Sequence, residues 1–204
     1  MGNFNALELS GLVNKFKSMP ELVNAVSANV INRSTTFAMD KSIGEIIREY
    51  TLKESYVRSK FKRVGRASKS NLRSIVRVSD RRTLLNRFRH AKTSNGVSVT
   101  IKRGVTKKIK RGFIVTNLKG SGTSGVAVMN LDRLNYLKTS THKSDRRPQA
   151  LSYMTGEFKK KPKGWTVLNT TSINNMFESK REDIKPILSV FMKKEFFKEF
   201  KSKL

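Results

Sequence analysis

Cysteine is absent from the 204-residue chain. Its absence excludes disulfide scaffolds, thiolate zinc sites and cysteine nucleophiles, and it fits synthesis and function in a reducing cytoplasm. Long apolar runs are also missing, and no stretch approaches the roughly 18 residues of a membrane span. The segment Met1-Gly2-Asn3-Phe4-Asn5 lacks the basic and apolar regions of a signal peptide. We therefore expect a non-secreted protein with no membrane partner.

Acidic residues are scarce. The chain has 15 Asp and Glu against 43 Lys and Arg, which gives a formal charge of +28. The imbalance is greatest in residues 55–120, which hold 20 Lys or Arg and one acid, Asp80. A solvated surface usually mixes charges of both signs. This window therefore predicts a surface that faces a polyanion, nucleic acid above all.

The sequence offers little for catalysis. His90 and His142 are far apart and belong to no motif, and the glycines of residues 120–125 lack the Lys-Ser/Thr ending of a phosphate-binding loop. A metal-dependent nuclease needs several carboxylates, and the basic window has only Asp80. We expect no enzyme, no cofactor and no metal site.

The first third of the chain has a helical period. Apolar residues predict a short amphipathic helix over residues 9–16 and a long helix that starts at Pro20 and continues to Tyr50, with Gly44 as a weak point. Thr51 and Glu54 have the spacing of a capping box, which predicts a third helix that ends near Gly65.

The middle changes to a period of two. Residues 72–79, 97–101, 112–117 and 125–129 are predicted strands of an antiparallel sheet, with residues 120–125 as a flexible connection. A short helix capped by Ser79 or Asp80 is expected between the first two strands. Residues 138–164 are Lys-rich and predict an irregular loop, and the apolar stripe from Ile184 to Phe200 predicts a terminal helix.

These patterns predict an α+β fold in a single domain. Its regions are a helical part (1–66), a small basic sheet (67–137), the Lys-rich loop (138–164) and a helical C-terminal part (165–204). The candidate surface for DNA or another partner comprises cations at the end of the third helix, on the first strand and around a hairpin: Arg58, Lys60, Lys62, Arg63, Arg66, Arg73, Arg77, Lys102, Arg103, Lys107, Lys108, Lys110 and Arg111. The aromatic residues of the window are spaced as core positions rather than as a base-stacking platform, which favours contact with the nucleic-acid backbone.

Several short motifs occur in a recognisable order. They are Ile31-Asn32-Arg33, residues 51–57, Lys62-Arg63, residues 75–79, residues 82–88, residues 99–104, residues 109–114 and residues 171–177. In this order the chain resembles the minor tail protein Z family of long-tailed bacteriophages, the tail completion proteins, over roughly residues 20–200.

The resemblance implies a structural protein of the virion, made in the host cytoplasm and placed at the head-proximal end of the tail. It would complete the tail for joining to the DNA-filled head. The implied partners are the tail terminator, connector and tail-tube proteins, further copies in a homo-oligomeric ring, and genomic DNA. The basic surface would face DNA or acidic proteins.

Two other functions remain open from the residues alone. A free, sequence-independent nucleic-acid-binding protein, associated with ribosomes or the nucleoid, would bind with an affinity that falls steeply with salt. A nuclease would degrade DNA in the presence of Mg²⁺ or Mn²⁺.

Overall fold

The computed structural model describes residues 19–118, 123–130 and 164–203. It confirms the α+β fold: a long N-terminal helix, several small antiparallel sheets and a C-terminal helix. The chain divides into two compact units. Unit 1 contains residues 1–45, 57–79 and 174–204, and unit 2 contains residues 46–56 and 80–173. Each unit therefore joins segments that are distant in the sequence. The four regions expected from the sequence are consecutive and do not show this grouping.

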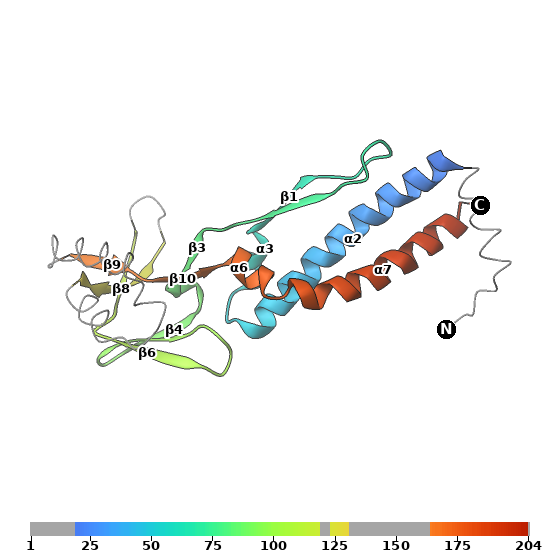
Figure 1. Cartoon of the computed structure of the whole chain (residues 1–204). Helices are drawn as coiled ribbons and strands as arrows, with labels where there is room; N and C mark the ends of the chain where they lie inside the picture. The colour runs from blue at the N-terminus through green and yellow to red at the C-terminus, as the bar shows by residue number, and fades with distance from the viewer. Residues whose placement is uncertain (1–18, 119–122, 131–163, 204) are drawn as a thin grey trace, which may run out of the picture. The chain divides into compact units, whose positions relative to one another are not determined.

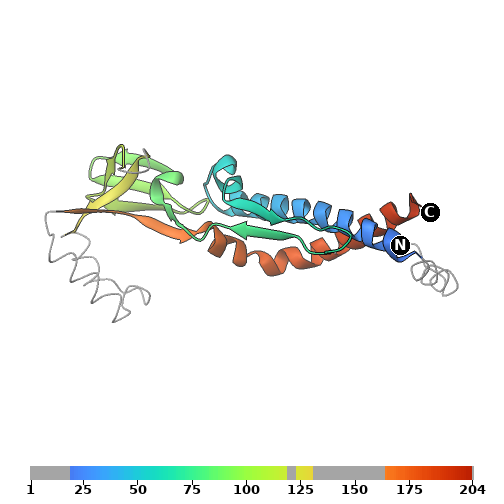
Figure 2. The same ribbon diagram turned by 90° about the horizontal axis from the view of Figure 1, so that it is seen from above.

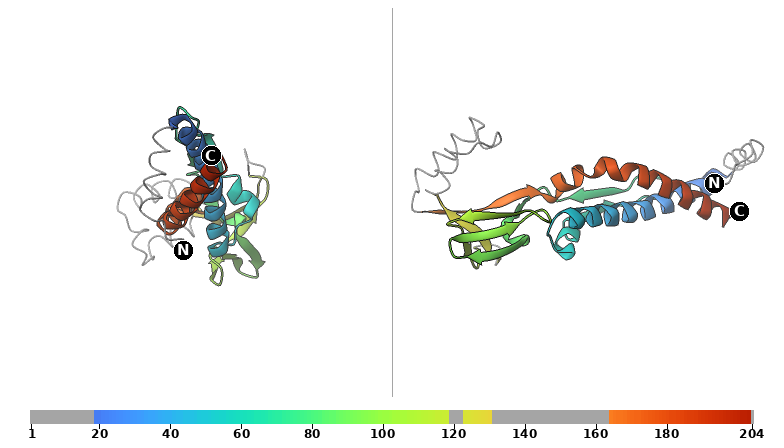
Figure 3. Two further views of the ribbon diagram at one scale, coloured as in Figure 1. Left: turned by 90° about the vertical axis from the view of Figure 1, so that its right-hand side faces the viewer. Right: turned by 90° about the horizontal axis from the view of Figure 1, so that it is seen from below.

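Two antiparallel helices form the frame of unit 1. Helix α2 (Pro20–Glu49) begins at the predicted proline and continues through Gly44, and α7 (Arg181–Lys201) runs beside it (Figures 1 and 3). Val26, Val30 and Phe200 form a buried cluster between them. Phe37 of α2 stacks on Phe191 of α7 with ring centroids 4.1 Å apart. The apolar stripe of each helix thus covers the other.

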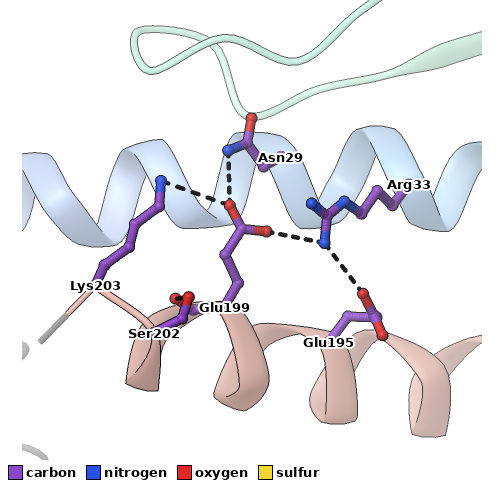
Figure 4. Close-up of polar contacts among 6 residues, drawn as sticks. All are labelled: Asn29, Arg33, Glu195, Glu199, Ser202 and Lys203. Carbon is purple, nitrogen blue, oxygen red and sulfur yellow. Dashed lines mark hydrogen bonds and ion pairs between the residues drawn. The ribbon is translucent and has the colours of Figure 1, made fainter.

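A polar cluster fixes the register of this helix pair (Figure 4). Asn29 Nδ2 donates to Glu199 Oε1 at 2.7 Å, and one turn further along α2 the Arg33 guanidinium lies 3.3 Å from Glu195 and 3.5 Å from Glu199. Lys203 adds an ion pair to Glu199 at 3.6 Å. Because Glu199 is only 8% exposed, a shift of one helix along the other would leave a buried carboxylate without its partners.

A two-stranded ribbon completes unit 1. Strands β1 (Phe61–Gly65) and β2 (Ile75–Val78) are antiparallel and run along α2 (Figures 1 and 2). Phe61 is buried and meets Phe177 of α6 (Ile173–Glu178) edge to face, with centroids 5.9 Å apart. The ribbon is therefore anchored to α6 at Phe61, the first residue of β1.

The predicted third helix is wrong over most of its length. Helix α3 comprises only Glu54–Arg58, and residues 61–65 are strand β1. Val64 is 44% exposed, and the buried Phe61 and partly buried Arg63 alternate with outward side chains, as in a strand. Thr51 does not cap α3 with its hydroxyl. That group donates to the carbonyl of Thr100 and accepts the backbone N–H of Arg89.

Unit 2 is built from short antiparallel strands. One sheet has the order β4-β5-β6, formed by Arg89–Thr93, Gly96–Thr100 and Thr106–Lys110. A second has the order β7-β8-β9, formed by Phe113–Val115, Gly125–Met129 and Trp165–Val167. Val97 and Val99 of β5 and Val126 of β8 are fully or almost fully buried, so the apolar faces of these strands form the core of unit 2.

The predicted strands over residues 72–79, 97–101, 112–117 and 125–129 are confirmed as β2, β5, β7 and β8. The helix expected after Ser79 is wrong. Strand β3 (Arg82–Leu84) pairs there with β10 (Asn169–Ser172), followed by a short 3-10 turn, η1 (Leu85–Arg87). Asp80 caps no helix here, and its carboxylate accepts a hydrogen bond from Ser172 at 3.1 Å.

The terminal helix is confirmed as α7, although two strands, β9 and β10, precede it. The predicted helix over residues 9–16 and nearly all of the loop over residues 138–164 lie outside the described residues, as do residues 119–122 of the glycine-rich connection.

Candidate nucleic-acid interface

The two faces of the β1–β2 ribbon differ in what their side chains contact. Arg63 points inward to α2, where its Nη2 donates to the Asn32 carbonyl at 3.0 Å and to the Thr36 hydroxyl at 2.8 Å. The side-chain amide of Asn32 holds the ribbon further along, donating to the carbonyl of Ala67 at 2.9 Å and accepting its N–H at 3.0 Å. Asn32 thus satisfies both backbone polar groups of Ala67.

The opposite face of the ribbon carries exposed cations. Lys62 and Arg77 lie directly across from each other in the strand register, and both are exposed. Arg66 follows β1 and Arg73 precedes β2, and both are exposed too. We call Lys62, Arg66, Arg73 and Arg77 the ribbon cations. Among the residues that the structure describes, none of the four forms an ion pair or a side-chain hydrogen bond.

Like charges that face each other across an antiparallel pair destabilise the sheet. Lys62 and Arg77 are such a pair, and no described acidic side chain offsets their charge. A ligand with closely spaced negative charges would remove this repulsion. The phosphate backbone of nucleic acid has that property.

Other predicted site residues are held by their own chain. Arg58 pairs with Asp40 at 2.7 Å, and Arg63 bonds to α2 as described, so these two cations contribute to the fold of unit 1. Lys60 is partly buried just before β1, and its carbonyl accepts the N–H of Ser79. The interpretation of residues 58–66 as one basic helical stripe is therefore wrong, because strand alternation sends neighbouring cations to opposite faces.

In unit 2, the cations that follow β5 are also engaged. Lys102 pairs with Glu49 at 2.5 Å, and its ammonium lies 5.6 Å from the Tyr50 ring centroid. The hydrogen bond to Glu49, followed by the field of Tyr50, raises the pKa of Lys102 above its usual range. Arg103 Nε donates to the carbonyl of Ile47 at 3.1 Å. These two residues fasten the end of α2 to the sheet of unit 2.

Three predicted cations lie on β6 rather than in a hairpin connection. Lys107 is paired with Val99 in the register, and Lys108 with Ser98. Side chains alternate along a strand, so Lys108 and Lys110 share the polar face of the sheet and Lys107 points to the other side. Arg111 follows with a positive φ of 55° in the turn to β7. The structure thus divides the predicted site into a set on the ribbon of unit 1 and a set on β6 of unit 2.

Sequence reasoning missed two groups of residues. The polar residues Asn29 and Asn32 organise unit 1, and the only sequence signal was the place of Asn32 in the Ile31-Asn32-Arg33 motif. The strand β4 also adds Arg89 and Lys92 to the basic surface of unit 2, and both are exposed. Residues 89–93 show no apolar alternation, so no local pattern predicted that strand.

The described residues contain no group of three or more His, Asp or Glu side chains placed to hold a metal ion. Within the same residues no helix combines the length and apolar character of a membrane span. His90 lies in β4, where its Nδ1 is 2.8 Å from the carbonyl of Phe88, and His142 is outside the described residues.

No family model, curated protein or solved structure matches the chain.

Proposed function

We propose that the chain is a structural, non-enzymatic protein that contacts nucleic acid without reading its sequence, in the setting of a bacteriophage tail. The observation that carries the nucleic-acid contact is the cross-strand pair of Lys62 and Arg77, exposed and without an acidic partner among the described residues. Several of the other predicted cations are tied to the fold, as Arg58 is to Asp40. The ribbon cations are left to interact with a ligand, and phosphates would release counterions on binding them.

The tail setting is supported by the resemblance to the minor tail protein Z family. In this proposal the chain lies at the head-proximal end of the tail, beside terminator, connector and tail-tube proteins, and the ribbon cations face the DNA. Self-association into a ring belongs to the same proposal and is supported by the same resemblance.

Quantitative mass spectrometry of purified phage particles tests the setting. We expect the chain at a small, fixed copy number per particle. Its absence from particles would contradict the structural role.

Charge reversal in the same particles tests the DNA contact. The double variant Lys62→Glu with Arg77→Glu should still enter particles but lower their infectivity, because the reversed pair repels DNA. The matched control, Lys193→Glu with Lys194→Glu, makes the same charge change at two exposed positions of α7. Equal infectivity of the two variants would contradict a role for the ribbon.

A free nucleic-acid-binding protein is the second candidate, and the exposed cations of β6 favour it to the same degree as the ribbon does. The two functions predict a different dependence of particle association on salt concentration. A tail protein stays in the particle at salt concentrations that abolish binding to free DNA, whereas a free binding protein is recovered from particles only at low salt.

A further inference from the structure

The outward face of the ribbon has apolar side chains as well as cations. Val64 is 44% and Ile75 39% exposed. Along β1 and the residue after it, the exposed side chains are Lys62, Val64 and Arg66, and along β2 and the residues before it they are Arg73, Ile75 and Arg77. The register shifts between Arg63 and Gly65, so Val64 has no cross-strand partner and Ile75 lies opposite Gly65. The ribbon therefore exposes two apolar residues with a pair of cations on either side of them along the strands.

The dimensions of this face match a groove of duplex DNA. Paired strands are about 4.8 Å apart, and four residues of strand cover about 13 Å. The B-form major groove is about 12 Å wide and admits a two-stranded ribbon, and the thymine methyl group offers an apolar contact there. Long cationic side chains at both ends of the ribbon can then reach phosphates on the two walls of the groove.

We propose that the outward face of the β1–β2 ribbon binds in the major groove of B-form DNA, with Val64 and Ile75 against the base edges and the ribbon cations at the phosphates. This inference rests on the proposed nucleic-acid contact and names its ligand. It adds an apolar contact that favours thymine wherever it occurs, and no recognition of an ordered base sequence. The inward face supports it, because Asn32 and Arg63 fix the ribbon on α2 before any ligand binds. A preformed surface loses little conformational entropy on binding.

Other nucleic acids fit this face less well. The major groove of A-form RNA is deep and narrow, and side chains cannot enter it. Single strands are held largely by stacking on aromatic rings. The one aromatic residue of the two strands is Phe61, which is buried against Phe177.

The test compares ligands of equal charge by fluorescence anisotropy with the full chain. A DNA duplex and an RNA duplex of the same sequence and length carry the same number of phosphates. We expect the DNA duplex to bind about tenfold more tightly, within the range of a lost groove contact. Replacing thymine by uracil in the DNA duplex removes the methyl groups and should weaken binding by the wild-type chain.

The double variant Val64→Ser with Ile75→Ser connects this preference to the ribbon. It should bind the thymine and uracil duplexes equally, because serine lacks the methyl groups that contact the thymine methyl. Both positions are exposed, so the replacement leaves the buried side of the ribbon unchanged. The control Val190→Ser changes an exposed valine of α7 and should keep the wild-type preference for thymine.

The outcomes separate this inference from the proposed function. Equal affinity for DNA and RNA duplexes would overturn groove binding while leaving a sequence-independent backbone contact intact. A preference for thymine that persists in the Val64→Ser, Ile75→Ser variant would overturn the role of the ribbon. Binding to phosphatidylserine vesicles but to no nucleic acid would overturn both, and would show that the cation and apolar pattern serves a membrane surface.

Discussion

The hydrogen bond between Asn29 and Glu199 should make a measurable contribution to the stability of unit 1. Asn29→Ala removes the amide that donates to the Glu199 carboxylate at 2.7 Å, while Glu199 stays 8% exposed. A hydrogen bond to a charged group contributes about 1.5–3 kcal/mol. We expect a loss of about 2 kcal/mol, since Arg33 and Lys203 still compensate the charge.

Urea unfolding followed by far-ultraviolet circular dichroism measures this loss, because α2 and α7 supply 30 and 21 helical residues. Asn24→Ala is the matched control. It makes the same substitution on the same helix, and Asn24 has no side-chain hydrogen bond among the described residues. Both variants gain the same helix propensity, roughly 0.5 kcal/mol. The difference between them therefore isolates the bond to Glu199.

A double-mutant cycle gives the coupling directly. Asn29→Ala combined with Glu199→Ala should show a coupling free energy of about 1–2 kcal/mol, as expected for a contacting pair. The reasoning is refuted if Asn29→Ala destabilises the chain no more than Asn24→Ala, or if the coupling is zero within error.

Three more predictions follow from contacts within the units. Asn32→Ala should abolish the hydrogen-exchange protection of the Ala67 N–H, which donates to the Asn32 side chain, and should lower the free energy of unfolding by about 2 kcal/mol. Unchanged protection of the Ala67 N–H would be inconsistent with this hydrogen bond. Gly96→Ala should prevent unit 2 from folding, judged by fluorescence of the single tryptophan, because a Cβ would lie 2.0 Å from a carbonyl of β6. Gly104 also has a positive φ, but its Cβ would meet no atom within 4 Å, so Gly104→Ala should be destabilised by the backbone strain alone and still fold. Lys185 donates a hydrogen bond to Glu182 and lowers the pKa of that carboxylate. The stability that this pair contributes is present above the unfolded-state pKa of Glu182 and is lost as the pH falls through its folded-state pKa. An NMR titration should show a higher Glu182 pKa in Lys185→Met than in the wild type, and no rise would refute the pairing.

The helices of unit 1 were predictable because their signals are local. Pro20 defined the start of α2, and the apolar spacing from Ile184 to Phe200 defined α7. The strands β5, β7 and β8 were predictable for the same reason, since their alternating or continuous apolar residues report burial directly.

Elements that depend on distant partners were not predictable. Strand β3 is stabilised by β10, so Thr83 is buried opposite Thr170, far along the chain. Without that partner, residues 80–88 have the local signals of a short helix. In the same way β1 pairs with β2 and its Phe61 packs on Phe177, contacts that no local pattern reveals.

The candidate site was predictable in composition but not in arrangement. The excess of cations in residues 55–120 is visible in the sequence. Which of them are available for a ligand depends on strand alternation: Lys62 points outward, and its neighbour Arg63 points to α2. Ion pairs such as Arg58 with Asp40 join residues on different elements. A count of charges cannot distinguish these two classes of cation.

The salt dependence of DNA binding shows whether the ribbon is the nucleic-acid contact. Each cation that neutralises a phosphate contributes about 0.9 to the slope of log Kobs against log salt. We expect Lys62→Gln with Arg77→Gln to lower this slope by about 1.8, while Lys193→Gln with Lys194→Gln on α7 leaves it unchanged. A ribbon variant that keeps the wild-type slope, or an α7 control that lowers it equally, would contradict the claim that the ribbon is the nucleic-acid contact.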